Sequence, residues 1–99
     1  MEIKHQTKEG RGRFVVYVNS KEAGYIKYDL MPNGNLKANG TLVYDEYREQ
    51  HLGKPLFDAL LNFAKEQGVK IYPTCPYVVA MFQKHPELNS YLDEDSSNR

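Results

Sequence analysis

The segment Tyr72-Pro73-Thr74-Cys75-Pro76-Tyr77-Val78 decides how the second half of the chain folds. Apolar residues over 69–72 predict a short strand, and Thr74 or Cys75 then precedes a proline, the residue that commonly opens a helix. Further apolar residues recur at helical spacing over 76–84, and His85-Pro86 ends the pattern, because the residue before a proline disfavours helical geometry. We therefore expect a strand that runs almost directly into a helix.

A longer helix is predicted upstream, over residues 53–67. Pro55 lies near its start and Gly68 follows its end. Its apolar face consists of Leu56, Phe57, Leu60, Leu61 and Ala64. A helix that joins two strands usually returns the chain parallel to the strand it left, so the strand at 69–72 should run parallel to the one before the helix.

The first half of the chain predicts four strands joined by turns. Runs of β-branched and aromatic residues cover 2–7, 13–19, 22–31 and 35–44. Pro32-Asn33-Gly34-Asn35 is a strong hairpin signal. Asn39-Gly40 interrupts the fourth strand, either as a second tight turn or as a β-bulge. We favour the bulge, because the two Asn-Gly pairs are too close for two hairpins.

Together these elements predict an α+β domain with α/β-type layers. Its sheet is mixed, mostly antiparallel and five-stranded, with helices packed on it, and a last short helix is expected over 86–92. We expect residues 1–92 to form a single domain and the polar residues 93–99 to form a frayed tail. The length of 99 residues suits one hydrophobic core.

Composition narrows the class of function. Lysine and arginine number 13, as do aspartate and glutamate, so the formal net charge is +0 and a nucleic-acid partner is not expected. That balance, together with the lack of an apolar run of membrane-spanning length, argues against a membrane partner. Cys75 is the only cysteine, which excludes an intrachain disulfide and predicts a cytoplasmic protein.

The polar loop before the 53–67 helix is a candidate anion site. Free N–H groups at a helix start and the helix dipole both favour negative charge, and Arg48 and Lys54 add positive charge on either side. A phosphate-bearing ligand would suit this loop. Every helix has such an end, so the spacing alone leaves an ordinary solvated loop as the other interpretation.

Two motifs connect this loop and the cysteine segment with a known family. Arg48-Glu49-Gln50-His51-Leu52-Gly53 resembles the Arg/Gln-x-x-Gly-x-Gly/Ala pyrophosphate loop of GNAT acetyltransferases. The cysteine segment, followed by His85-Pro86-Glu87, is similar to the Pro-x-Cys-Pro-Tyr-Val…His-Pro-Glu signature of the small single-domain GNAT-like group. Three positions depart from the family pattern: Glu49 and His51 replace glycines, and Gly40 replaces a histidine.

The resemblance implies an activity and a cosubstrate. It implies transfer of acetyl from acetyl-CoA to a primary amine, either a small amine or an exposed lysine, with acetyl-CoA lying in a gap between the fourth and fifth strands. The cofactor-binding residues that it implies are Val43, Arg48, Gln50, His51, Leu52, Gly53, Lys54 and Cys75. The missing histidine favours an alternative, a catalytically degenerate GNAT-fold module that binds CoA or a protein partner. No metal is expected.

Cys75 has two interpretations. A lone cysteine is most often a small buried apolar side chain. At a helix start, however, N–H groups favour the nucleophilic thiolate, and the resemblance places Cys75 near the acetyl thioester, as a catalytic residue or as part of the lining. Neither His51 nor His85 matches the family histidine. Asp45 and Glu46 are most simply a solvated acidic turn, and a proton-accepting role through water is their weaker alternative.

Overall fold

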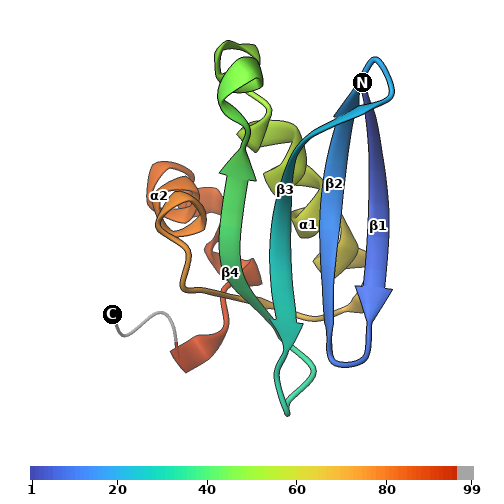
Figure 1. Ribbon diagram of the computed structural model, residues 1–99. Helices are drawn as coiled ribbons and strands as arrows, with labels where there is room; N and C mark the ends of the chain where they lie inside the picture. Colours follow the sequence, from blue (N-terminus) through green and yellow to red (C-terminus); the bar gives the residue numbers. More distant parts are fainter. Residues whose placement is uncertain (96–99) are drawn as a thin grey trace.

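The computed structural model describes residues 1–95, which form one five-stranded sheet with helices packed beside it (Figure 1). The strands are β1 (Glu2–Lys8), β2 (Arg11–Val18), β3 (Lys21–Leu30), β4 (Leu36–Val43) and β5 (Ile71–Pro73). The helices are α1 (Gly53–Gln67) and α2 (Pro76–Lys84), and two short 3₁₀ segments are η1 (Asp45–Gln50) and η2 (Pro86–Tyr91). The predicted α+β class is confirmed.

Strand order in the sheet follows strand order in the chain. The first four strands form an antiparallel meander, and β5 lies beside β4 in parallel after the chain has passed through α1. The sheet is therefore mixed and mostly antiparallel, and the parallel return predicted from the helical crossover is confirmed.

Short turns with left-handed backbone set the register of the meander. The β2–β3 turn consists of Asn19 and Ser20, both with positive φ, which matches the twist of the flanking strands. Gly10 and Gly34 supply positive φ in the other two hairpin turns. In the β3–β4 turn the Gly34 N–H donates to the Met31 carbonyl at 2.9 Å, so the predicted hairpin is confirmed.

A β-bulge interrupts β4 where the sequence predicts one. Lys27 pairs with Gly40 and Tyr28 pairs with Ala38, which leaves Asn39 as an extra residue on β4. The Asn39 side-chain amide donates to the Asp29 carboxylate at 2.9 Å. Because a bulge bends its strand and increases the local twist, the second half of β4 leaves the path of the first half.

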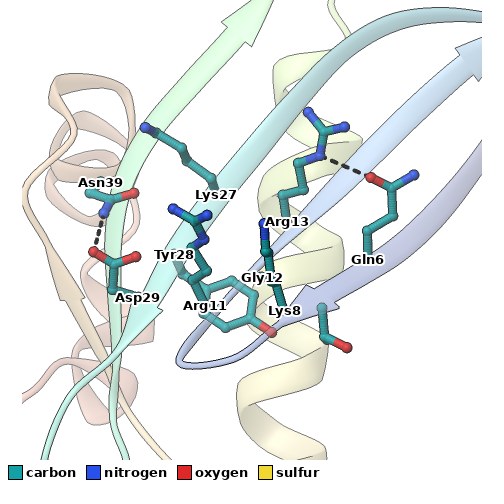
Figure 2. Close-up of a pocket in the computed structure, with 10 residues that line it drawn as sticks. Gln6, Lys8, Arg11, Gly12, Arg13, Lys27, Tyr28, Asp29 and Asn39 are labelled. Atoms are coloured by element: carbon teal, nitrogen blue, oxygen red, sulfur yellow. Dashed lines mark hydrogen bonds between the residues drawn. The ribbon is translucent and has the colours of Figure 1, made fainter.

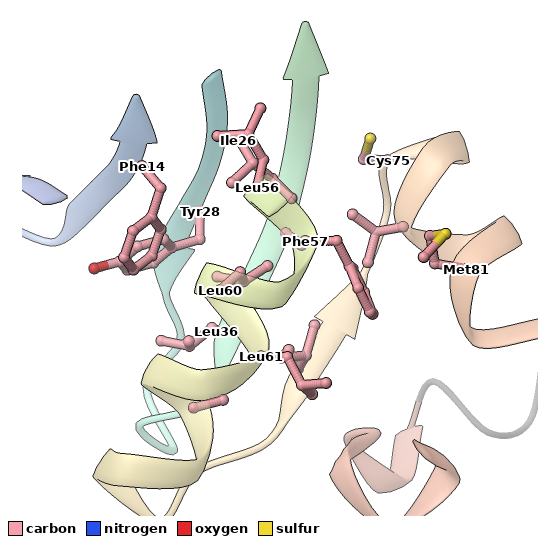
Figure 3. Close-up of a cluster of buried hydrophobic side chains, with 14 of the residues drawn as sticks. Phe14, Ile26, Tyr28, Leu36, Leu56, Phe57, Leu60, Leu61, Cys75 and Met81 are labelled. Carbon is pink, nitrogen blue, oxygen red and sulfur yellow. The ribbon is translucent and has the colours of Figure 1, made fainter. Parts of the chain in front are cut away.

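The hydrophobic core lies between α1 and one face of the sheet (Figure 3). The predicted apolar face of α1 is buried and packs on β2, β3 and β4. From the sheet, Phe14, Ile26, Tyr28 and Leu36 belong to the same core cluster. Gly12 is buried beside them, and a Cβ there would collide with the Tyr28 hydroxyl, so the ring occupies the space that the glycine leaves.

The opposite face of the sheet, which we call the outer face, has no helix across it within residues 1–95 (Figure 1). Its own long side chains cover it. Val15 lies outside the core cluster yet is 0% exposed, between Lys4 on β1 and Tyr25 on β3, which pair with it. The Arg13 guanidinium lies 5.6 Å from the Tyr25 ring centroid. The outer face is thus a layer of tyrosines and cations above a single buried valine.

Several boundaries differ from the expected ones. The expected loop over 45–53 contains η1, anchored by buried Tyr47, and the strand expected at 69–72 lies at Ile71–Pro73. The last helix, expected over 86–92, is a 3₁₀ segment, a form that short helical pieces commonly take.

The polar tail was expected to begin at Asp93, but the structure buries that residue. Asp93 is 2% exposed and accepts hydrogen bonds from the side chains of Asn35 at 2.6 Å and Asn33 at 3.2 Å. The bond from Asn35 is the main reason that the pKa of Asp93 lies below its usual value. These bonds tie the end of η2 to the β3–β4 turn. Residues 96–99 of the expected tail lie outside the described residues.

Gly24 should not tolerate a side chain. A Cβ there would lie 2.5 Å from the Leu42 carbonyl oxygen and 3.0 Å from the Val43 Cα, both backbone atoms of β4. At Gly40, by contrast, a Cβ would meet only the Lys27 side chain, which can move. In urea denaturation we expect Gly24→Ala to lower the free energy of unfolding by about 1–3 kcal/mol. The control Gly40→Ala should change it by less than about 1 kcal/mol. Equal losses in the two variants would contradict this account.

Candidate active site

The sheet opens between β4 and β5. The two strands pair only from Leu36 with Ile71 to Ala38 with Pro73. The Ala38 carbonyl oxygen then accepts from the Thr74 N–H at 2.9 Å, the Cys75 N–H at 3.0 Å and the Thr74 hydroxyl at 3.0 Å. Beyond this point, residues 40–43 pair with β3 and have no strand on their other side within residues 1–95. The divergence of the fourth and fifth strands, implied by the family resemblance, is confirmed.

Cys75 stands at the start of α2, beside this opening (Figure 3). It is 6% exposed, and its Sγ lies 3.3 Å from the Thr41 Oγ1. Thr41 belongs to residues 40–43, which lack a β5 partner and which we call the unpaired half of β4. Pro76 is the first helical residue, as predicted, and the N-cap position makes no side-chain capping bond. The thiol is therefore buried where β4 and β5 separate, and it is hydrogen-bonded to β4.

The start of α1 lies next to the start of α2. A Cβ on Gly53 would lie 2.9 Å from the Tyr77 ring, so glycine lets the two helix starts approach closely. Desolvation in this contact raises the pKa of Tyr77. No side chain caps the α1 N-terminus, and no acidic residue lies in its first turn. Lys54 lies in that turn and forms an ion pair with Asp58 at 3.0 Å.

The loop between β4 and α1 keeps a backbone shape that suits glycine. His51 has a φ of 53°, in the left-handed region, and it occupies a position where the resembled motif has glycine. Histidine is among the residue types that enter this region more often than most. Buried Tyr47 and Leu52 fix the loop on either side. His51 therefore adopts the left-handed conformation that a glycine takes without strain.

The polar residues of η1 lie in solvent. Arg48 forms an ion pair with Asp45 within the same turn, and both side chains are mostly exposed. Glu46 pairs with Lys21 at 3.7 Å. Such exposed pairs contribute little to stability, so the acidic turn is the solvated feature that we expected in the first place. The Arg48 side chain is free to exchange one anion for another.

Two of the three histidines, His5 and His85, lie apart from the thiol. His85 ends α2, about 15 Å along the helix axis from Cys75, and pairs with Glu87 at 3.4 Å. His5 is on the far edge strand, where it stacks on Phe14 and lies 2.7 Å from the Tyr28 hydroxyl. Partial desolvation there lowers the pKa of His5. The position that the resemblance assigns to a base is Gly40, with the Lys27 side chain beside it.

Several predicted site residues lie together at the opening, and two of the contacts there were not predicted. Val43 ends the unpaired half of β4, while Leu52, Gly53 and Lys54 open α1, so these flank the same opening as Cys75. The contact of Thr41 with Cys75 and the packing of Tyr77 on Gly53 were missed. Tyr77 lies inside a quoted motif and Thr41 directly follows Gly40, but their contacts join distant parts of the chain.

A comparison with protein families decides the affiliation of the chain. The model of the GCN5-related N-acetyl-transferase family matches residues 13–92. The chain belongs to this family. Both motifs lie within the match, so the family resemblance inferred from them is confirmed.

Similarity to solved structures supports the fold. The chain is similar to the crystal structure of a ribosomal-protein-alanine N-acetyltransferase from Brucella melitensis biovar Abortus 2308, with a TM-score of 0.61. The two are 19% identical, and the match covers 73% of this chain and 56% of that one. The family member described here thus spans little more than half of that enzyme. No curated protein sequence matches the chain significantly.

Residues 1–95 hold neither a metal-binding cluster nor a membrane-spanning helix. No group of three or more histidine, cysteine, aspartate or glutamate side chains is placed to hold a metal ion there. None of the helices in this range is both long enough and apolar enough to cross a bilayer.

Cys75 offers a direct probe of the opening, since it is the only cysteine. Because it is buried, we expect iodoacetamide to label it more slowly in the folded protein than in urea, and saturating acetyl-CoA to slow the labelling further. Mass spectrometry of the intact protein measures both rates, and Cys75→Ala is the unlabelled control. A labelling rate that acetyl-CoA leaves unchanged would place the thiol in the packed core and away from the bound cosubstrate.

Proposed function

We propose that the chain is an acetyl-CoA-dependent N-acetyltransferase that acetylates a primary amine. The observation that supports this most directly is the opening between β4 and β5, with two uncapped helix starts beside it. Backbone that is unpaired on β4 offers hydrogen bonds to an extended amide-bearing chain, and free helix-start N–H groups suit phosphate. These are the two kinds of group that the pantetheine and pyrophosphate portions of acetyl-CoA carry.

The proposed binding mode assigns a part of the cosubstrate to each segment. Val43 and its neighbours on β4 hold the pantetheine arm through backbone bonds. The loop from Arg48 to Lys54, which includes Gln50, His51 and Leu52, holds the pyrophosphate mainly through backbone N–H groups. Arg48 and Lys54 add charge from exposed positions, where water and salt screen it. Cys75 lines the acetyl end of the opening beside Thr41.

The reaction requires a neutral amine close to the thioester carbonyl. The amine nitrogen attacks the carbonyl carbon, the C–N bond forms, the C–S bond breaks, and the amine proton leaves with the thiolate or with solvent. Backbone N–H groups on the unpaired half of β4 are the proposed donors to the developing oxyanion. In this proposal Cys75 lines the site, because a nucleophilic role would need a partner base and its polar contact is a threonine hydroxyl.

A second candidate function is a module that binds CoA or a protein partner without catalysis. The observation that favours it lies at Gly40. A side chain at that position would begin 2.6 Å from Cε of Lys27, so the space that a base would enter is occupied by a lysine side chain. The Lys27 side chain is flexible, and the acceptor amine can reach its neutral form without a protein base. The observation therefore argues against a base at position 40 more strongly than it argues against acetyl transfer.

Charge reversal along α1 tests the proposed pyrophosphate site. We expect Lys54→Glu to raise the Kd for CoA about tenfold, because it places a negative charge at the free helix start. The matched control Lys65→Glu makes the same change in the last turn and should leave the Kd unchanged. Isothermal titration at low salt measures both. Equal effects of the two variants would rule out binding at the start of α1.

The pH dependence of transfer distinguishes an unassisted amine from a protein base. Lysine amines have a pKa of about 10.4, so without a protein base the neutral fraction rises about tenfold per pH unit between pH 7 and 9. We expect the rate of free-CoA release with a lysine acceptor to follow that rise. Transfer that levels off near neutral pH would show a protein base and contradict the proposal. Tight CoA binding with no release over a broad amine panel would favour the binding module.

A further inference from the structure

The outer face of the sheet holds a cleft of about 500 Å³ that the proposed cosubstrate does not use (Figure 2). The cleft extends from the β1–β2 hairpin across β3 to the bulge of β4. Four cations line it, Lys8, Arg11, Arg13 and Lys27, together with one carboxylate, Asp29. Although the chain has a formal net charge of +0, this part of its surface is strongly basic.

The strand register places like charges directly opposite one another in the cleft. Lys8 pairs with Arg11 across β1 and β2, and Arg13 pairs with Lys27 across β2 and β3. Like charges in directly opposed positions destabilise a sheet. The ion pairs among residues 1–95 involve other cations, but Asp29 on β3 is paired directly with Arg11 on β2 and offsets part of this repulsion. Asp29 accepts a hydrogen bond from the Asn39 amide. Four cations and one carboxylate leave the cleft with an excess of positive charge, which an anionic ligand would balance.

We propose that this cleft, which we call the basic cleft, is a docking site for an acidic peptide segment of a partner protein. Arg11 and Arg13 are two residues apart on one strand, so their Cα atoms are separated by about 6.6 Å along β2. Alternate side chains of an extended peptide have the same spacing. Aspartate or glutamate residues of such a peptide therefore match the cations one to one.

A short acidic segment fits this molecule better than a nucleic acid does. The cations of the cleft are balanced elsewhere on the chain by carboxylates, because the formal net charge is +0. A long polyanion that extends beyond the cleft meets those carboxylates and is repelled, whereas a few acidic side chains remain inside it.

The cleft ends beside the proposed acetyl site. The Lys27 side chain lies against Gly40 on the outer face, and the next residue of β4 is Thr41, whose side chain lies on the opposite face of the sheet and contacts Cys75. A lysine adjacent to the bound acidic segment would therefore reach the acetyl site past the edge of residues 40–43, where β4 has no β5 partner. The identification of this lysine as the acetyl acceptor rests on the proposed function, but the docking of the acidic segment does not.

Direct binding tests the cleft without the cosubstrate. The probe is a fluorescein-labelled peptide of about eight residues, Asp and Glu around a central Lys, and the comparison peptide has Asn and Gln in their place. Fluorescence anisotropy at about 50 and 300 mM NaCl should show binding of the acidic peptide alone, weaker at high salt. Failure of the acidic peptide to bind, or equal binding of the neutral one, overturns the proposal.

Two double variants with the same change of charge test whether the peptide binds in the basic cleft. Lys8→Glu with Lys27→Glu turns both repulsive cross-strand pairs into attractive ones, so the fold should keep or raise its melting temperature. The Kd for the acidic peptide should nevertheless rise at least about tenfold. Lys65→Glu with Lys84→Glu makes the same total change of charge at the ends of α1 and α2 and should leave the Kd unchanged. Equal losses in the two variants overturn the proposal.

Two competitors and one activity measurement complete the test. A single-stranded oligonucleotide or tripolyphosphate that binds the cleft more tightly than the peptide at equal salt overturns the choice of ligand. With acetyl-CoA present, the KM for the lysine should be about tenfold lower in the acidic peptide than in the neutral one, and the Lys8/Lys27 variant should abolish the difference. Transfer with equal KM values overturns the acceptor assignment. Peptide binding without transfer to any amine refutes acetyl transfer and supports the docking site alone.

Discussion

The carbonyl oxygen of Ala38 is the point on which the rest of the structure depends. Two backbone N–H groups and one hydroxyl, all from Thr74 and Cys75, converge on this single acceptor and end the β4–β5 ladder. One residue later, the bulge at Asn39 bends β4 away. Since the chain after β5 turns at once into α2, the two strands cannot meet again. The opening therefore results from backbone hydrogen bonding and needs no large side chain to hold it apart.

The helices were predictable because their signals are local. Pro76, and Pro55 with Gly68, mark the ends of α2 and α1, and the apolar residues between them keep one helical period, so both helices begin and end where expected. The 3₁₀ segment η1 has no such period, because Tyr47 is its only buried residue. Asp93 was assigned to a tail for a similar reason. Its burial depends on Asn33 and Asn35, which are distant in sequence and carry no local signal.

The site was predictable to the extent that it consists of motifs. The loop before α1 and the segment around Cys75 were recognisable, and the structure brings them to one opening. The contacts of Thr41 and Tyr77 depend on how β4, α1 and α2 pack, which no single segment encodes. The basic cleft was hidden for another reason. A net charge averages over the surface, and the strand register alone reveals that the cations of three strands gather on one face.

The order of the strands has a consequence for how the chain folds. In β1 to β4 every pairing joins neighbours in sequence through a tight turn, so this meander forms by local contacts with little loss of chain entropy. The pairing of β5 with β4 is different, because it must close a loop that contains all of α1. The free-energy barrier of folding should therefore lie in that closure. A chain whose meander has formed already possesses the outer face, whereas the opening between β4 and β5 comes into being only with the last strand.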